Sequence, residues 1–192
     1  MIKVNVNRIG FNGQTGEAIV LLDEPNEQKV LPICIGLLEA NAISLALYQQ
    51  KSSRPLTHEL LFCVIQDLGY LVDKVEITEI KDNAFYASVF LRKQASGRFK
   101  KTTLKKIDAR PSDAIALALR SEAPIYVDRA VLEQAAVSAE AIVRQTAGDT
   151  RDFQDGKKFK QFLQEVKASD FKLRGKPPEA GESEGQSDVS GA

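Results

Sequence analysis

Two segments of the chain, Leu31–Leu47 and Thr103–Leu119, change in the same way from a strand pattern to a helix pattern. They align without gaps at a shift of 72 residues, and both end in the motif Ala-Ile-x-Leu-Ala-Leu. Each change from period two to period 3.6 predicts a strand, a short turn and a helix. Helices rich in alanine and leucine also resemble one another by chance, so the sequence leaves open whether the repeat is real. A real repeat would turn two polar helix starts toward a common cleft, with Asn41 at the position equivalent to Asp113.

The rest of the chain alternates between the same two patterns, separated by turn residues. The first two strands are expected to form a hairpin. Thr57 is expected to cap the second helix and Gly69 to end it, with Pro111 at the first position of the third. The second helix is expected to bury a stripe made of Leu60, Leu61, Val64, Ile65 and Leu68. Strands are expected at residues 2–9, 17–22, 30–35, 72–80, 85–91, 102–107 and 124–127, and helices at 37–50, 57–68, 111–120 and 131–136.

Composition limits the class of protein. A length of 192 residues favours one domain, or one domain with an appendage. The chain has no apolar run that could span a bilayer and no apolar core of an export signal at its start, so we expect a cytoplasmic protein with no membrane partner. Cys34 and Cys63 lie in apolar runs without CxxC spacing. They are expected to be buried, reduced thiols, with a disulfide as the alternative.

Charge is balanced overall, with 26 basic and 26 acidic residues, but it is segregated along the chain. Residues 92–106 hold seven basic residues, including Lys100 and Lys101, and no acidic one. With Phe99 available to stack on a base, this basic segment is the predicted nucleic-acid contact, and a solvated hairpin tip is the alternative. Residues 138–156 are expected to form a linker, 157–173 a short helical motif, and 174–192 a disordered acidic tail.

A first polar cluster, made of Asp108, Arg110, Ser112 and Asp113, lies where the last long strand passes into a helix. Carboxylates beside an arginine at a helix start can hold a divalent cation and a phosphate. Metal-assisted phosphodiester cleavage needs that combination. In the structural alternative, Ser112 or Asp113 caps the helix and Arg110 pairs with a carboxylate.

A second polar cluster surrounds His58, which is the only histidine of the chain. His58 falls in a first helical turn, where the helix dipole disfavours imidazolium, so a neutral ring could act as a general base. Arg54 precedes a proline as Arg110 does, and two such arginines could clamp one phosphate. A packing or surface role is the alternative for both residues.

A third group, Glu39 and Asn41, lies early in the first helix. Glu39 could be a further metal-binding carboxylate, or it could simply complement the helix dipole. The chain contains no Walker loop, Rossmann glycine motif, HExxH or GxSxG. No organic cofactor is therefore expected, and zincin and α/β-hydrolase chemistry have no support.

Three motifs in this order, VLPICIGLLEANAISLAL, RPLTHELL and IDARPSDAIALALRSEAPIYV, resemble the bifunctional nuclease family. The resemblance covers residues 1–137. It implies a compact α+β domain with a mixed, curved sheet packed by helices, and an activity on both DNA and RNA. Residues 159–171 resemble the C-terminal extension of bacterial members, without its proline, and Glu59 stands where the family often has aspartate. The matching positions are Glu39, Asn41, Arg54, Pro55, Thr57, His58, Asp108, Arg110, Pro111, Ser112 and Asp113.

The leading hypothesis is a nuclease assisted by Mg²⁺ or Mn²⁺. The predicted catalytic residues are His58, which moves a proton, and the three metal-binding carboxylates Asp108, Asp113 and Glu39. The predicted substrate-binding residues are Arg54, Arg110, Ser112, Asn41, Lys100 and Lys101. The alternative is a non-enzymatic module that binds an anionic ligand or a protein. Converging carboxylates would favour the enzyme, and carboxylates held in ion pairs would favour the binding module. Edge strands and apolar helices also predict a homo-oligomer.

Overall fold

Eight strands and four helices make up the residues that the computed structural model describes, which are 1–11, 17–26, 28–50, 52–94 and 104–139. All of them belong to one unit, Met1–Gln154. The predicted C-terminal motif and tail, together with Lys100 and Lys101, lie outside the described residues. In chain order the elements are β1 (Ile2–Phe11), β2 (Ala18–Glu24), β3 (Lys29–Ile35), α1 (Leu37–Leu47), α2 (Thr57–Asp67), β4 (Tyr70–Lys81), β5 (Ala84–Lys93), β6 (Leu104–Ala109), α3 (Pro111–Ser121), β7 (Ile125–Val127), α4 (Arg129–Ala135) and β8 (Val137–Ser138).

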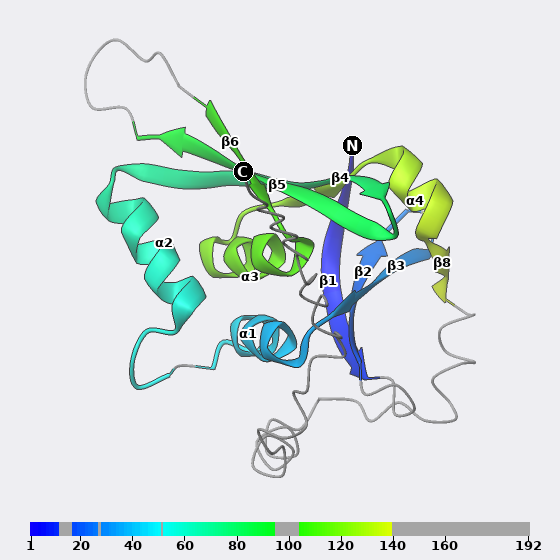
Figure 1. Ribbon diagram of the computed structural model, residues 1–192, viewed down its shortest axis with the longest axis horizontal. Helices are drawn as coiled ribbons and strands as arrows, with labels where there is room; N and C mark the ends of the chain where they lie inside the picture. The colour runs from blue at the N-terminus through cyan, green and yellow to red at the C-terminus, as the bar shows by residue number, and fades with distance from the viewer. Residues whose placement is uncertain (12–16, 27, 51, 95–103, 140–192) are drawn as a thin grey trace, which may run out of the picture. The chain divides into compact units, whose positions relative to one another are not determined.

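The strands form one sheet in the order β6-β5-β4-β7-β1-β2-β3-β8. Its pairs are antiparallel except for β4 and β7, so the mixed sheet and the α+β class are confirmed. The register shifts between Val6 and Arg8 in β1 and twice within β4. Such irregularities bend a strand and increase its twist. In Figure 1, α1, α2 and α3 lie together on one side of β4 and β5, while α4 lies near β8.

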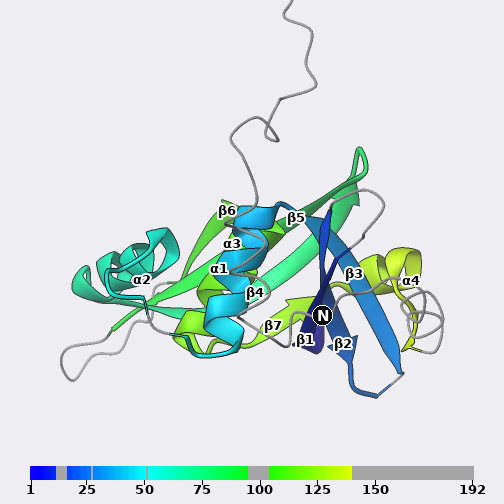
Figure 2. The same cartoon turned by 90° about the horizontal axis from the view of Figure 1, so that it is seen from below.

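Helix α3 lies at the centre of the core, with seven of its eleven residues buried. Ala114, Ala116 and Ala118 are at most 1% exposed, and their small side chains let α1 and the sheet approach closely. Ile115 fills the remaining space and is fully buried. Figure 2 shows α1 alongside α3. The two helices of the predicted repeat therefore pack on each other.

Helix α2 differs from its prediction. Of its apolar residues only Ile65 is buried, whereas Leu60, Leu61, Val64 and Leu68 are 44–68% exposed. The predicted buried stripe is wrong because α2 lies at the border of the helix layer and keeps one side toward solvent (Figure 1). The N-cap of the helix is Leu56, one residue before the predicted Thr57, and Gly69 follows the end of the helix with a φ of 74°. Of the described helices, none combines the length and the apolar character that a membrane crossing needs.

Both cysteines are free and exposed, so the prediction that they are buried is wrong. Cys34 lies between Ile33, which faces the core, and Ile35, and strand alternation turns its side chain outward. Cys63 lies on the exposed side of α2. An apolar run in the sequence marks an element, but it does not say which face of that element is covered.

Truncation of Ile115 to alanine should lower the free energy of unfolding by about 2–5 kcal/mol, because it leaves a cavity in a fully buried position. The matched variant Leu60→Ala, at a side chain that is 57% exposed, should change it by less than about 0.5 kcal/mol. Urea denaturation followed by circular dichroism measures both. Equal losses in the two variants would mean that α2 is covered in solution.

Candidate functional site

Four charged or titratable side chains meet where α1, α2 and α3 begin. Arg110 lies between two carboxylates: its Nη1 donates to Glu39 Oε1 at 2.9 Å, and its Nε donates to Asp113 Oδ2 at 2.7 Å. A third bond joins Arg110 Nη2 to Asp113 Oδ1 at 3.1 Å. His58 Nε2 lies 3.1 Å from the same Oδ1. We call Glu39, His58, Arg110 and Asp113 the Arg110 cluster.

Local helix geometry explains the centre of this cluster. Arg110 is the N-cap of α3, Pro111 is at the start of the helix, and Asp113 lies in the first turn. Proline fits the first position because its missing N–H would have no partner there. The first turn places Asp113 three residues after the cap, on the same side, where the guanidinium fork can grip both carboxylate oxygens. The predicted capping of this helix by Asp113 or Ser112 is wrong, since the N-cap is Arg110 and no side chain caps it.

The opposite end of α3 holds α1 in place through Arg120, which the sequence analysis did not identify. Its Nη2 donates to the carbonyl of Ala42 at 3.0 Å, and its Nη1 to that of Ala116 at 2.8 Å. Ala42 lies one helical turn after Glu39, so this contact supports the position of Glu39 beside Arg110. The sequence feature that could have identified Arg120 is its position as a basic residue in the last turn of a helix that is mostly apolar. Burial lowers the pKa of Arg120, with Glu59 acting in the opposite direction.

The charges of the cluster set the protonation of its members. Burial raises the pKa of Asp113, but hydrogen bonds from Arg110 and His58 outweigh it and hold that pKa below its usual value. Asp113 is therefore a carboxylate at neutral pH and can only accept hydrogen bonds. It follows that His58 Nε2 carries a proton and donates it to Asp113. In the neutral imidazole, Nδ1 then keeps the lone pair of a base.

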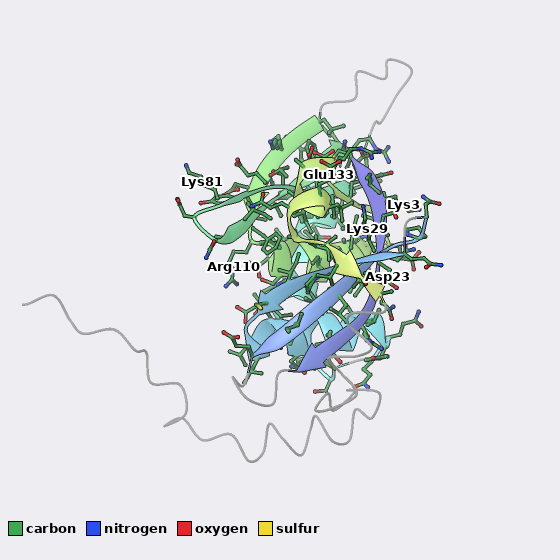
Figure 3. All side chains as sticks on the ribbon, turned by 90° about the vertical axis from the view of Figure 1, so that its right-hand side faces the viewer. Lys3, Asp23, Lys29, Lys81, Arg110 and Glu133 are labelled. Atoms are coloured by element: carbon green, nitrogen blue, oxygen red, sulfur yellow. The ribbon has the colours of Figure 1, made fainter. Side chains whose placement is uncertain are left out.

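Arg110 retains capacity for a further ligand. A guanidinium has five N–H donors, and the three bonds above use three of them. The side chain is 66% exposed, and Figure 3 places Arg110 at the margin of the molecule. Two N–H groups thus remain for an anion such as a phosphate, in the fixed geometry that suits oxyanions.

Asp108 does not join the cluster, which corrects the predicted set of three carboxylates. In the register of β6, Ile107 and Ala109 lie opposite Val89 and Ala87, both of which belong to the core. Asp108 lies opposite Ser88 and, by strand alternation, points to the other face of the sheet. The strand continues to Ala109, two residues beyond the predicted end, and this extension turns Asp108 away.

The remaining predicted residues are spread around the cluster. Ser112 is 6% exposed and lies in the packing of α3, so its predicted contact with substrate is not supported. Asn41 is half-buried on α1, where Glu39 rather than Asn41 reaches Arg110. Arg54 is exposed in the segment before α2 and makes no hydrogen bond or ion pair to the cluster.

The donor set of the cluster does not suit a divalent cation as it stands. Within the described ranges, no three His, Cys, Asp or Glu side chains are grouped so that they could hold a metal ion. The guanidinium of Arg110 occupies the position between Glu39 and Asp113 that a cation would need. The sequence analysis expected converging carboxylates in an enzyme and ion-paired carboxylates in a module that binds an anion. Glu39 and Asp113 are both ion-paired, which favours recognition of an anion.

Comparisons with known proteins bear on the same region. The family model described as the bifunctional nuclease domain matches residues 20–140, which include the whole cluster. An uncharacterised protein of Mycobacterium tuberculosis is 36% identical over 90% of this chain and 99% of its own length. Bifunctional nuclease 1 of Oryza sativa subsp. indica is 32% identical over 59% of the chain, but the match covers 33% of the rice protein. Bifunctional nuclease 1 of Arabidopsis thaliana is 30% identical over 58% of the chain and 33% of its own length.

Proposed function

The chain belongs to the bifunctional nuclease domain family, and from that premise we propose that it hydrolyses phosphodiester bonds of DNA and RNA at the Arg110 cluster. The observation that carries the proposal is the pair formed by His58 and Asp113 beside the exposed guanidinium of Arg110. The pair supplies a general base, and Arg110 supplies a cation that binds the phosphate; hydrolysis of a phosphodiester uses both. The names of the plant relatives support the reaction class, although each match covers about a third of the plant protein.

Each member of the cluster has a role in this proposal. Asp113 fixes the tautomer and orientation of His58, whose Nδ1 accepts a proton from the attacking water. Arg110 binds a non-bridging phosphate oxygen through its two remaining N–H groups and stabilises the charge that develops there. Glu39 holds the guanidinium from the other side, so that its plane does not rotate away from the substrate.

Further positive charge must attract the substrate, because with a neutral His58 the cluster itself has one positive and two negative side chains. The ends of β5 and β6 provide it through Arg92, Lys93, Lys105 and Lys106, all exposed. β6 leads directly from these lysines to Arg110. We therefore propose that a nucleic acid passes over the ends of β5 and β6, where the basic segment 92–106 is expected to contact it, and reaches Arg110 with its scissile phosphate while the backbone edge of β6 stays free.

A second candidate function is recognition of an anion without turnover. It is favoured by the ion pairs that occupy Glu39 and Asp113. In this case Arg110 binds a nucleotide or nucleic-acid phosphate and His58 only supports Asp113.

The deciding experiment incubates the purified chain with fluorescently labelled single-stranded DNA and RNA, in EDTA and in Mg²⁺ or Mn²⁺. We expect cleavage of both substrates. Activity in EDTA would favour the His58 mechanism, and activity only with a divalent cation would favour the metal assistance predicted from the sequence. Binding of the oligonucleotides without cleavage in any condition would reject the nuclease and support the anion-binding module.

A further inference from the structure

The two edges of the sheet differ in how they are protected. One edge ends in β8, which has only two residues, whereas the other ends in β6, with six residues. Every side chain from Leu104 to Asp108 is exposed, so no residue that the structure describes covers this edge. β6 also contains no proline. A long edge strand of this kind presents unpaired N–H and C=O groups to another chain.

Lysines usually protect such an edge, and β6 has two of them, Lys105 and Lys106. Lys105 already contacts the ring of Tyr70, with its Nζ 5.0 Å from the ring centroid. Within the part of the chain that the structure describes, Lys106 and Asp108 have no ion-pair partner, and they lie on the same face of the strand. The pattern Lys106, Ile107, Asp108 therefore has opposite charges on the two sides of an exposed isoleucine.

Symmetry limits how two copies of β6 can pair. A twofold axis that relates antiparallel edge strands is perpendicular to the sheet and passes midway between one residue and the same residue of the second copy. Centres at Lys105, Lys106 or Asp108 each place two like charges directly opposite, which is unfavourable. A centre at Ile107 places Ile107 against Ile107, and Lys106 against Asp108 on both sides of it. Of these four centres, only the one at Ile107 has complementary charges.

We propose that β6 pairs with β6 of a second copy of this chain, centred on Ile107, and so joins two sheets into one. The pairing forms two Lys106–Asp108 ion pairs and covers the exposed Ile107, which is 45% exposed in one copy. Leu104 of the second copy lies opposite Arg110, so the interface ends beside the Arg110 cluster. This inference stands without the proposed nuclease activity, because it rests on the edge strand alone.

The exposed apolar side of α2 is a weaker candidate for the contact between copies. Its charged residues, Glu59 and Asp67, are both acidic, and the helix contains no lysine or arginine. A twofold contact between two α2 helices would bring these acidic side chains together with no basic residue of the helix to compensate. The charge pattern of β6, by contrast, is complementary to itself.

Charge reversal tests the pairing directly. Sedimentation velocity of the full-length chain over a concentration series should show a dimer. Lys106→Asp and Asp108→Lys should each raise the dimer Kd by at least about 10-fold, because each places like charges opposite one another. The double variant Lys106→Asp/Asp108→Lys should restore the Kd, since the two charges are then exchanged. Lys81→Asp, at the exposed end of β4 (labelled in Figure 3), makes the same change in charge elsewhere and should leave the Kd unchanged.

Circular dichroism checks that each variant is folded, and hydrogen exchange of the wild-type chain gives a second measurement. Amides of β6 should become more protected as the concentration of the chain rises. A monomer at all concentrations, with no change in β6 protection, would overturn the proposal. So would a dimer that the single reversals leave intact, or one that the double variant fails to restore. Dissociation by Leu60→Lys alone would place the contact on α2 instead.

Discussion

Replacing Asp113 by asparagine is expected to lower kcat/KM for oligonucleotide cleavage by about 10²- to 10⁴-fold, the usual range for loss of a general base. Asparagine keeps the size of the side chain but removes the charge that holds the Nε2 proton of His58 and both bonds of the Arg110 fork. Its amide can donate to His58 instead, which favours the tautomer with Nδ1 protonated and so removes the base. The measurement is the initial rate on single-stranded DNA and RNA, with binding measured separately.

Two aspartates provide comparisons for this variant. Asp82→Asn, in the exposed turn between β4 and β5, makes the same chemical change far from the cluster in sequence and should keep full activity. Asp108→Asn distinguishes the two versions of the site: its loss of activity would favour the three-carboxylate metal site predicted from the sequence. Full activity of Asp113→Asn would reject the His58–Asp113 pair as the catalytic element.

Exchange of Arg110 for lysine should have the second-largest effect, although it conserves the charge. Lysine cannot reproduce the fork that joins Glu39, Asp113 and an incoming phosphate. Loss of one charged hydrogen bond to the phosphate corresponds to about 1.5–3 kcal/mol, or about 10- to 100-fold in kcat/KM. Because Arg110 is proposed both to bind the phosphate and to stabilise the charge that develops on it, we expect KM and the Kd for the oligonucleotide to rise and kcat to fall.

The matched control for this variant is Arg129→Lys, at the exposed first position of α4. It should leave kcat, KM and oligonucleotide binding unchanged. Arg110→Gln extends the series, since it removes the cation from between Glu39 and Asp113 and thereby raises the pKa of Asp113. Wild-type activity in Arg110→Lys, together with loss of activity in Arg110→Gln, would mean that the positive charge alone is sufficient. The geometry of the guanidinium fork would then have no role.

Most of the fold could be predicted because the elements follow local rules. Alternation of apolar and polar residues predicted β1 and β2 to within a few residues of their observed bounds. Gly69, which adopts a positive φ, predicted the end of α2 equally well. Local rules could not predict which face of each helix or strand is covered by another element. Helix α2 shows this most clearly, since an apolar stripe such as Leu60 and Val64 looks the same in a sequence whether or not another element covers it.

The candidate site was predicted in its composition but not in its connections. Glu39, His58, Arg110 and Asp113 were all identified from residue type and position. The error concerned Asp108, which was expected just after the strand but lies within it, where the alternation of side chains decides its face. The link from Arg110 to Glu39 depends on the packing of α1 against α3, which no local pattern encodes.

The contacts of the Arg110 cluster join residues that are far apart in the chain: His58 and Asp113 are separated by 55 positions, and Glu39 and Arg110 by 71. Contacts of such long range form late, because the intervening chain must first lose its freedom. During synthesis from the N-terminus, α1 and α2 leave the ribosome without their partners on α3. The Arg110 cluster is therefore complete only after α3 has left the ribosome, and the proposed nuclease activity begins only from that point.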